Sequence, residues 1–139
     1  SLKLAERLDR LAGEKNTKLP VLLEFNVGAE TSKQGWQAHD ESRWSDLFPA
    51  MNMVLKLENL TVRGLMTMPP LFTDAQKSRP FFEKLRRLRD VLAQNFPASD
   101  WRELSMGTSS DFETAVEEGA TLVRVGTAIL GARPSKLNF

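Results

Sequence analysis

Two short turns near the end of the chain carry the groups that proteins use to bind a phosphate. In the first, SMGTSS at residues 105–110, Ser105 supplies a hydroxyl and Gly107 lets a ligand approach the backbone, next to free amides that open a predicted helix. The second, Gly126-Thr127, also comes directly before a short helical segment. Such turns are also common as plain helix caps. Their repetition after successive strands predicts a site for an anionic ligand.

Arg124 lies within the apolar run at residues 121–125, two positions before Gly126. Alternate side chains of a strand share a face, so Arg124 is expected on the same face as Leu122 and Gly126. A buried guanidinium needs a partner, because an unpaired buried charge is strongly destabilising. Two interpretations are open: an anionic ligand in the neighbouring turns, or an internal ion pair with Glu24 or Glu103.

Asn26 and Met66 are further candidate site residues, because each lies near the end of a predicted strand. Asn26 shares a face with Glu24, and if the inner faces coincide, Asn26 meets Ser105 and Arg124 in the interior. Met66 shares a face with a second methionine two residues later. This pair predicts either ordinary core packing or a flat, polarizable wall against an aromatic ligand.

The apolar pattern places these candidates on alternating helices and strands. The expected strands cover residues 21–27, 60–68, 101–106 and 121–125; the expected helices cover residues 1–12, 44–55, 81–96, 112–118 and 128–130. Ser110 and Glu113 predict a capping box at the start of the helix at residue 112. The alternation predicts an α/β fold with four parallel strands and crossover helices.

Four such units are half of a (β/α)8 TIM-type barrel, whose usual length is about 250 residues. The phosphate site of such barrels lies in the loops after the seventh and eighth strands, which is where both turns fall if these strands are the last two. We therefore expect residues 1–139 to form the C-terminal half of a barrel. An open flavodoxin-like sheet is the alternative, and it would need a fifth strand and helices on both faces.

The composition restricts the partners and the chemistry. Nineteen Lys and Arg against 18 Asp and Glu give a net charge of +1, which does not favour nucleic acid. No cysteine and a single histidine argue against a thiolate or histidine-cluster metal site. No apolar run approaches the roughly 20 residues of a membrane span. We expect a cytoplasmic protein with a small-molecule ligand and with no metal, nucleic-acid or membrane partner.

Three runs in the sequence resemble the pyridoxal phosphate homeostasis proteins. They are VRGLMTMP at residues 62–69, LSMG at 104–107 followed by Ser109, and EGATLVRVGTAILG at 118–131. The loop ETSKQG at residues 30–35 resembles that family's Ser-Lys-x-Gly loop. The runs follow the C-terminal half of the family in order. The resemblance implies a barrel like the N-terminal domain of alanine racemase.

The resemblance also implies that the protein binds pyridoxal 5′-phosphate (PLP) and has no catalytic residues. It implies phosphate contacts from Ser105, Gly107, Gly126 and Thr127, a contact of Arg124 with the pyridine nitrogen, and a ring site lined by Met66 and Asn26. The lysine that forms a Schiff base in this family lies in the N-terminal half, and no lysine of the present chain matches its motif. The covalent anchor is therefore expected upstream of this sequence.

Two enzyme functions stand as alternatives. A PLP-dependent amino-acid racemase or decarboxylase of the same barrel type would need a tyrosine from another domain as second base, because this chain has no tyrosine. A barrel enzyme acting on a sugar phosphate would use Glu24 or Glu103 as acid or base. A half barrel would also expose Leu22, Met66 and Leu122, so we expect this chain to self-associate and the intact protein to be a monomer.

Overall fold

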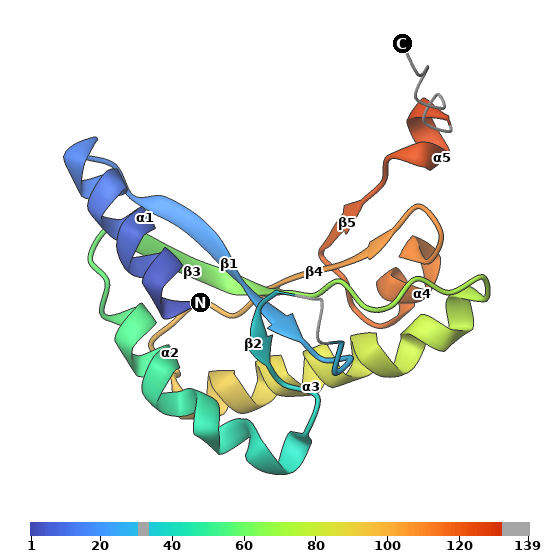
Figure 1. Ribbon diagram of the computed structural model, residues 1–139, viewed down its shortest axis with the longest axis horizontal. Coiled ribbons are helices and arrows are strands. Elements are labelled where there is room, and N and C mark those ends of the chain that lie inside the picture. Colours follow the sequence, from blue (N-terminus) through green and yellow to red (C-terminus); the bar gives the residue numbers. More distant parts are fainter. Residues whose placement is uncertain (31–33, 132–139) are drawn as a thin grey trace.

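The computed structural model describes residues 1–30 and 34–131, and these form one all-parallel sheet with helices (Figure 1). The five strands lie in the order β2-β1-β3-β4-β5. The strands are β1 (Leu19–Asn26), β2 (Trp36–Gln37), β3 (Leu60–Met66), β4 (Glu103–Thr108) and β5 (Leu122–Arg124). The helices are α1 (Leu2–Glu14), α2 (Phe48–Leu55), α3 (Arg79–Asn95), α4 (Phe112–Glu117) and α5 (Thr127–Leu130), with two 3-10 segments, η1 (Glu41–Leu47) and η2 (Ala75–Ser78). The predicted parallel α/β fold is confirmed.

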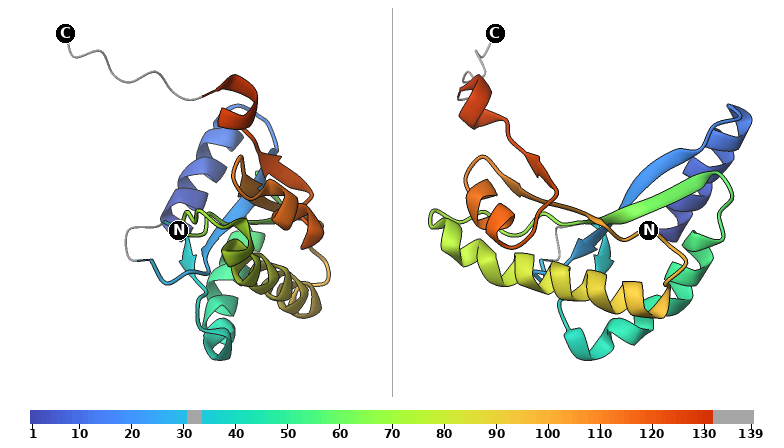
Figure 2. Two further views of the ribbon diagram at one scale, coloured as in Figure 1. Left: turned by 90° about the vertical axis from the view of Figure 1, so that its right-hand side faces the viewer. Right: turned by 180° about the vertical axis from the view of Figure 1, so that it is seen from behind.

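Helices α2, α3 and α4 pack on one face of the sheet, and α1 lies beside α2 next to the edge strand β1 (Figure 1). Both ends of the sheet curve away from that layer, and β5 and α5 extend from the rest of the fold (Figure 2). Among the described residues, no helix covers the opposite face. The flavodoxin-like alternative needs helices on both faces, so this arrangement argues against it.

The hydrophobic core lies between the strands and α3, because α3 presents one apolar stripe to the sheet. Leu85, Leu88 and Leu92 of this helix are fully buried, as their spacing predicts. Phe82 completes the stripe with no exposure, whereas the adjacent Phe81 is only partly buried. From the sheet side, the core receives residues of alternate strand positions, among them Leu23, Phe25, Leu65, Leu104 and Met106.

Three local expectations are wrong. The fifth strand, β2, has only two residues, which is too short for an alternating pattern to reveal it. Strand β4 begins at Glu103 rather than at residue 101, because Trp101 is buried outside the sheet and its Nε1 donates to the Phe96 carbonyl at 3.0 Å. Helix α4 has Asp111 at its N-cap, without a side-chain cap, so Ser110 and Glu113 form no capping box.

The helices of the described residues include none that is long and apolar enough to cross a bilayer.

Gly64 allows β3 and β4 to pair closely. It has a φ of +151°, and a Cβ atom placed on it would lie 1.9 Å from the carbonyl oxygen of Glu103 on the neighbouring strand. A side chain here would push apart the two strands that lead to the candidate site.

We predict that Gly64→Ala lowers the free energy of unfolding by about 2–4 kcal/mol, because the added methyl group collides with backbone that cannot move aside. The measurement is urea unfolding followed by tryptophan fluorescence. Gly126→Ala is the control, since its Cβ would meet nothing within 4 Å. Equal unfolding midpoints for the two variants would contradict the prediction.

Candidate functional site

The candidate site residues gather where the parallel strands end. Met66 is the last residue of β3, and it pairs in register with Ser105 of β4. Arg124 is the last residue of β5, and it pairs in register with Thr108. Because the carboxyl ends of parallel strands meet at one edge, these residues and the turns after them form one side of the fold. Ligands of parallel α/β folds bind at this side.

Arg124 connects β5 to β4 and to the residue that follows β3 at this edge. One guanidinium nitrogen, Nη1, donates to the Ser105 Oγ at 2.6 Å, and the other, Nη2, donates to the Thr67 carbonyl oxygen at 2.9 Å. Burial lowers the pKa of the guanidinium from its ordinary value, and the negative charges of Asp111 and Glu24 oppose that shift. An arginine remains cationic at neutral pH despite such a shift. The arrangement therefore places a fixed positive charge beside the two turns.

The described residues do not form the predicted internal ion pair between Arg124 and Glu24 or Glu103. The Glu103 carboxylate accepts a hydrogen bond from the Thr121 hydroxyl at 2.6 Å instead. Glu24 acts on Arg124 only as a nearby charge, without a hydrogen bond between them. The guanidinium is thus held by neutral acceptors, and its charge has no ion-pair partner in this part of the chain.

Ser109 joins the two predicted phosphate turns. Its Oγ accepts hydrogen bonds from the backbone N–H of Gly126 at 3.0 Å and of Ala128 at 3.2 Å. A cavity of about 480 Å³ lies at this junction and is lined by residues of both turns, including Thr127, and by Leu71. The turn amides thus already converge on one oxygen atom, which is the arrangement that an anion requires.

Gly107 and Asp111 determine the shape of the first turn. Gly107 has a φ of +89°, and a Cβ atom on it would lie 2.5 Å from the Ala115 Cβ, so the glycine lets α4 pack directly on the end of β4. Asp111 is buried, and its Oδ1 accepts from the Thr108 N–H at 2.7 Å and from the Thr108 hydroxyl at 3.1 Å. The carboxylate therefore stabilises the turn internally.

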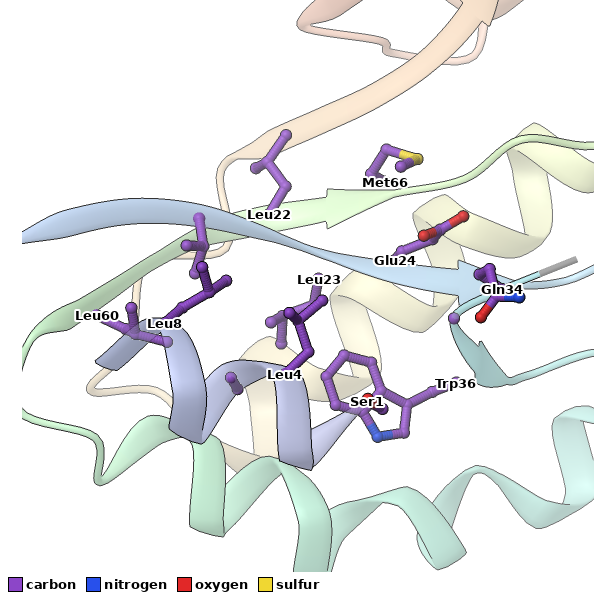
Figure 3. A pocket seen from close by; sticks show the side chains of 13 residues that line it. Ser1, Leu4, Leu8, Leu22, Leu23, Glu24, Gln34, Trp36, Leu60 and Met66 are labelled. Carbon is purple, nitrogen blue, oxygen red and sulfur yellow. The ribbon is translucent and has the colours of Figure 1, made fainter. Parts of the chain in front are cut away.

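Asn26 and Met66 lie apart from the cavity at the two turns. The buried Asn26 side chain binds its own loop: Nδ2 donates to the Glu30 carbonyl at 2.6 Å, and Oδ1 accepts from the Gly28 N–H at 3.2 Å. Met66 lines a second cavity of about 380 Å³, beside α1 and β1 (Figure 3). Ser105 and Arg124 lie between these residues and the turns.

Sequence reasoning assigned no individual role to three residues that shape this region: Ser109, which it named only as part of the first turn, and Thr67 and Asp111. Ser109 was within reach, because it belongs to the hydroxyl-rich run that defines the first turn. The Thr67 carbonyl accepts from Arg124 because of where the backbone runs after β3, and a pattern of side chains does not predict this. Residues 31–33 of the Ser-Lys-x-Gly loop lie outside the described residues. Among the described residues, no group of three or more acidic, His or Cys side chains could hold a metal ion.

The sequence matches the family model described as "Alanine racemase, N-terminal domain" over residues 1–134. The chain belongs to this family. Its curated relatives include pyridoxal phosphate homeostasis proteins, and the expected resemblance is thereby confirmed. The protein from Aquifex aeolicus is 42% identical over 130 residues, which cover 94% of this chain and 54% of the relative. The protein from Homo sapiens is 37% identical over 138 residues, which cover 96% of this chain and 48% of the relative.

The chain thus spans about half the length of the curated relatives it matches. The same holds for PipY of Synechococcus elongatus PCC7942. Without PLP, PipY matches with a TM-score of 0.83 and 37% identity, over 94% of this chain and 58% of PipY. The PipY structure with PLP bound matches with a TM-score of 0.79 and 36% identity, over 94% of this chain and 57% of PipY. An alanine racemase from Clostridium difficile 630 matches with a TM-score of 0.70 at 19% identity, over 98% of this chain and 35% of the racemase, which shows a shared fold.

We predict that Ser109→Ala speeds amide exchange at residues 126–131 by about 3- to 10-fold, because it removes the acceptor that connects this segment to β4. Hydrogen–deuterium exchange with mass spectrometry measures the rate. Ser110→Ala is the control, because the exposed Ser110 lines the same cavity but shows no hydrogen bond to the Gly126 turn among the described residues. Unchanged exchange in Ser109→Ala would show that the Ser109 hydroxyl does not hold the turn.

We also predict that Ser105→Ala lowers the free energy of unfolding by about 1–2 kcal/mol, because it removes an acceptor of a charged, partly buried donor. Chemical unfolding measures the loss, and Ser110→Ala should stay within about 0.5 kcal/mol of the parent chain. If Ser105→Ala were as stable as the parent chain, the hydrogen bond between Arg124 and Ser105 would contribute nothing to the free energy of unfolding.

Proposed function

We propose that this chain is the PLP-binding half of a homeostasis protein that does not turn over a substrate. The observation that carries the proposal is the junction of the two turns, where backbone amides converge on the Ser109 hydroxyl beside the cationic Arg124. A phosphate oxygen is a stronger acceptor than a hydroxyl and suits the same donors. The PLP-bound PipY structure, at 36% identity, supports PLP as the ligand.

In this proposal the phosphate is held by Ser105, Gly107, Gly126 and Thr127, with Ser109 between the turns. Gly126 and Thr127 already line the cavity at the junction, whereas Ser105 and Gly107 approach it from β4. Arg124 has five N–H donors and shows bonds from two of its nitrogens, so it retains donors for a ligand. Met66 and Asn26 would line the ring from β3 and β1.

The charge expected near the ring supports the proposed absence of turnover. PLP normally supplies an electron sink that depends on a protonated pyridine nitrogen. A guanidinium facing this nitrogen disfavours its protonation. We assign the covalent lysine to a part of the protein outside this chain and assign no catalytic residue within it. The relatives' names support this proposal over the racemase and sugar-phosphate alternatives.

We further propose that residues 1–139 are the C-terminal half of an eight-stranded (β/α)8 barrel. Four strands, β1 and β3 to β5, lie side by side in chain order, the packed helices lie on one face, and the chain spans about half of its relatives. The uncovered face must then be closed by other strands, either of the same protein or of another copy. We place the protein in the cytoplasm, with the cofactor as its small-molecule partner and without a nucleic-acid or membrane partner.

Titration of the chain with PLP, pyridoxal and ribose 5-phosphate, followed by PLP absorbance and by calorimetry, tests this proposal. We expect PLP to bind more tightly than pyridoxal, because the turns recognise the phosphate, and more tightly than the sugar phosphate, which lacks the ring. Thr127→Val should weaken PLP binding about 10-fold, equivalent to about 1.4 kcal/mol. Thr61→Val, at an exposed position of β3, is the matched control.

Equal affinity for PLP and pyridoxal would contradict the phosphate site, and tight binding of ribose 5-phosphate would favour the sugar-phosphate alternative. In the intact protein, borohydride reduction with PLP should label a lysine upstream of residue 1; a label within this chain would contradict the assignment. Racemisation of a panel of amino acids by the intact protein would favour the enzyme alternative.

A further inference from the structure

Thr67, the residue that follows β3, is bonded to three different strands. Its N–H donates to the Ser105 carbonyl of β4 at 3.1 Å, and its carbonyl accepts from Arg124 of β5 at 2.9 Å. Its hydroxyl donates to the Phe25 carbonyl of β1 at 2.8 Å. The N–H, the carbonyl and the hydroxyl of this one residue are therefore all bonded within the sheet.

The Thr67 side chain is buried inside the fold. Alternate side chains of a strand share a face, so Thr67 continues the face of the fully buried Leu65, and it is itself 1% exposed. A hydroxyl buried to this extent needs an acceptor, because an unpaired polar group is costly away from water. The Phe25 carbonyl supplies that acceptor, so the bond joins the carboxyl ends of β1 and β3.

The Thr67 carbonyl lies where the ladder between β3 and β4 ends. The register pairs of these strands stop at Met66 and Ser105. Two prolines follow at residues 69–70, and proline has no N–H with which to extend a ladder. Arg124 donates to the Thr67 carbonyl through Nη2, and to the Ser105 hydroxyl through Nη1 at 2.6 Å. The direction of the guanidinium therefore depends on the direction of the Thr67 peptide.

We propose that Thr67 is a positioning residue of the ligand site, because its hydroxyl bond to β1 fixes the peptide whose carbonyl directs the Arg124 guanidinium. This inference rests on the proposed function, in which Arg124 faces the ring nitrogen of PLP. A guanidinium presents its donors in one plane, so two fixed acceptors determine where the remaining donors point. The Ser105 hydroxyl can rotate about its side-chain bond, whereas the Thr67 carbonyl moves only with its peptide.

Two substitutions of Thr67 separate this role from packing. Thr67→Val keeps the size and the branching of the side chain and removes the hydroxyl. Thr67→Ser keeps the hydroxyl and removes the methyl group. A positioning role through the hydrogen bond requires a defect in the valine variant that the serine variant does not share. Thr61→Val, at an exposed position of the same strand, is the matched control.

Hydrogen exchange of the Arg124 Nη–H groups, followed by NMR of the intact protein without PLP, measures the positioning directly. We expect Thr67→Val to speed this exchange about 3- to 10-fold, because loss of the bond to Phe25 frees the Thr67 peptide. Thr67→Ser and Thr61→Val should exchange at nearly the parent rate. Thr67→Ala, which also lacks the hydroxyl, replaces Thr67→Val if the valine variant does not fold.

NMR of PLP labelled at the pyridine nitrogen, at one fixed pH, connects the positioning to the ligand. A displaced guanidinium opposes protonation of this nitrogen less strongly. We therefore expect the signal in Thr67→Val to move toward that of the protonated nitrogen, and the signal in Thr67→Ser to stay at the parent position.

Unchanged Arg124 exchange in the variants without the hydroxyl, or equal effects of Thr67→Val and Thr67→Ser, would overturn the proposal. A pyridine signal that is the same in every variant would overturn the connection between Thr67 and the ligand. Failure of the parent protein to bind PLP would count against the proposed function, whereas the Arg124 exchange without PLP still decides whether Thr67 positions the guanidinium.

Discussion

The bonds of Arg124 hold the last strand of the sheet in place. Strand β5 has three residues and meets β4 at only two register pairs, with an irregularity between them. The guanidinium adds contacts to β4 and to the chain just after β3. The turn at Gly126 follows two residues later, so its position relative to the first turn depends on this side chain. The Arg124 guanidinium, whose charged form is disfavoured by burial, thus fixes the candidate site to the sheet.

This dependence connects the two turns and the sheet into one candidate site. Gly64 brings β3 and β4 close enough for Met66 to lie beside Ser105, and Gly107 lets α4 begin directly behind β4. Arg124 then spans the strand ends, and Ser109 connects the turns. Most of these contacts join groups far apart in sequence, and together they place the amides that converge on Ser109 near a positive charge.

The parts of this structure that depend on local periodicity could be predicted from the sequence. The apolar runs of β1 and β3 and the stripe of α3 identified these elements, and their alternation identified the parallel sheet. The two-residue β2 was missed, because it exists only through its pairing with Phe25 and Asn26. The partner of Arg124 was left open, since neither Ser105 nor the Thr67 carbonyl differs in the sequence from many other neutral acceptors.

The hydroxyl of Ser109 has a consequence for the energetics of binding at the proposed phosphate site. The backbone N–H groups of Gly126 and Ala128 already donate to this hydroxyl, so their convergence does not have to be maintained by strain. Binding is then an exchange of acceptors in which the ligand competes with an internal alcohol group. A neutral ligand gains little from this competition, whereas a dianion gains at each amide. The proposed phosphate site would thereby discriminate between charged and uncharged forms of a ligand.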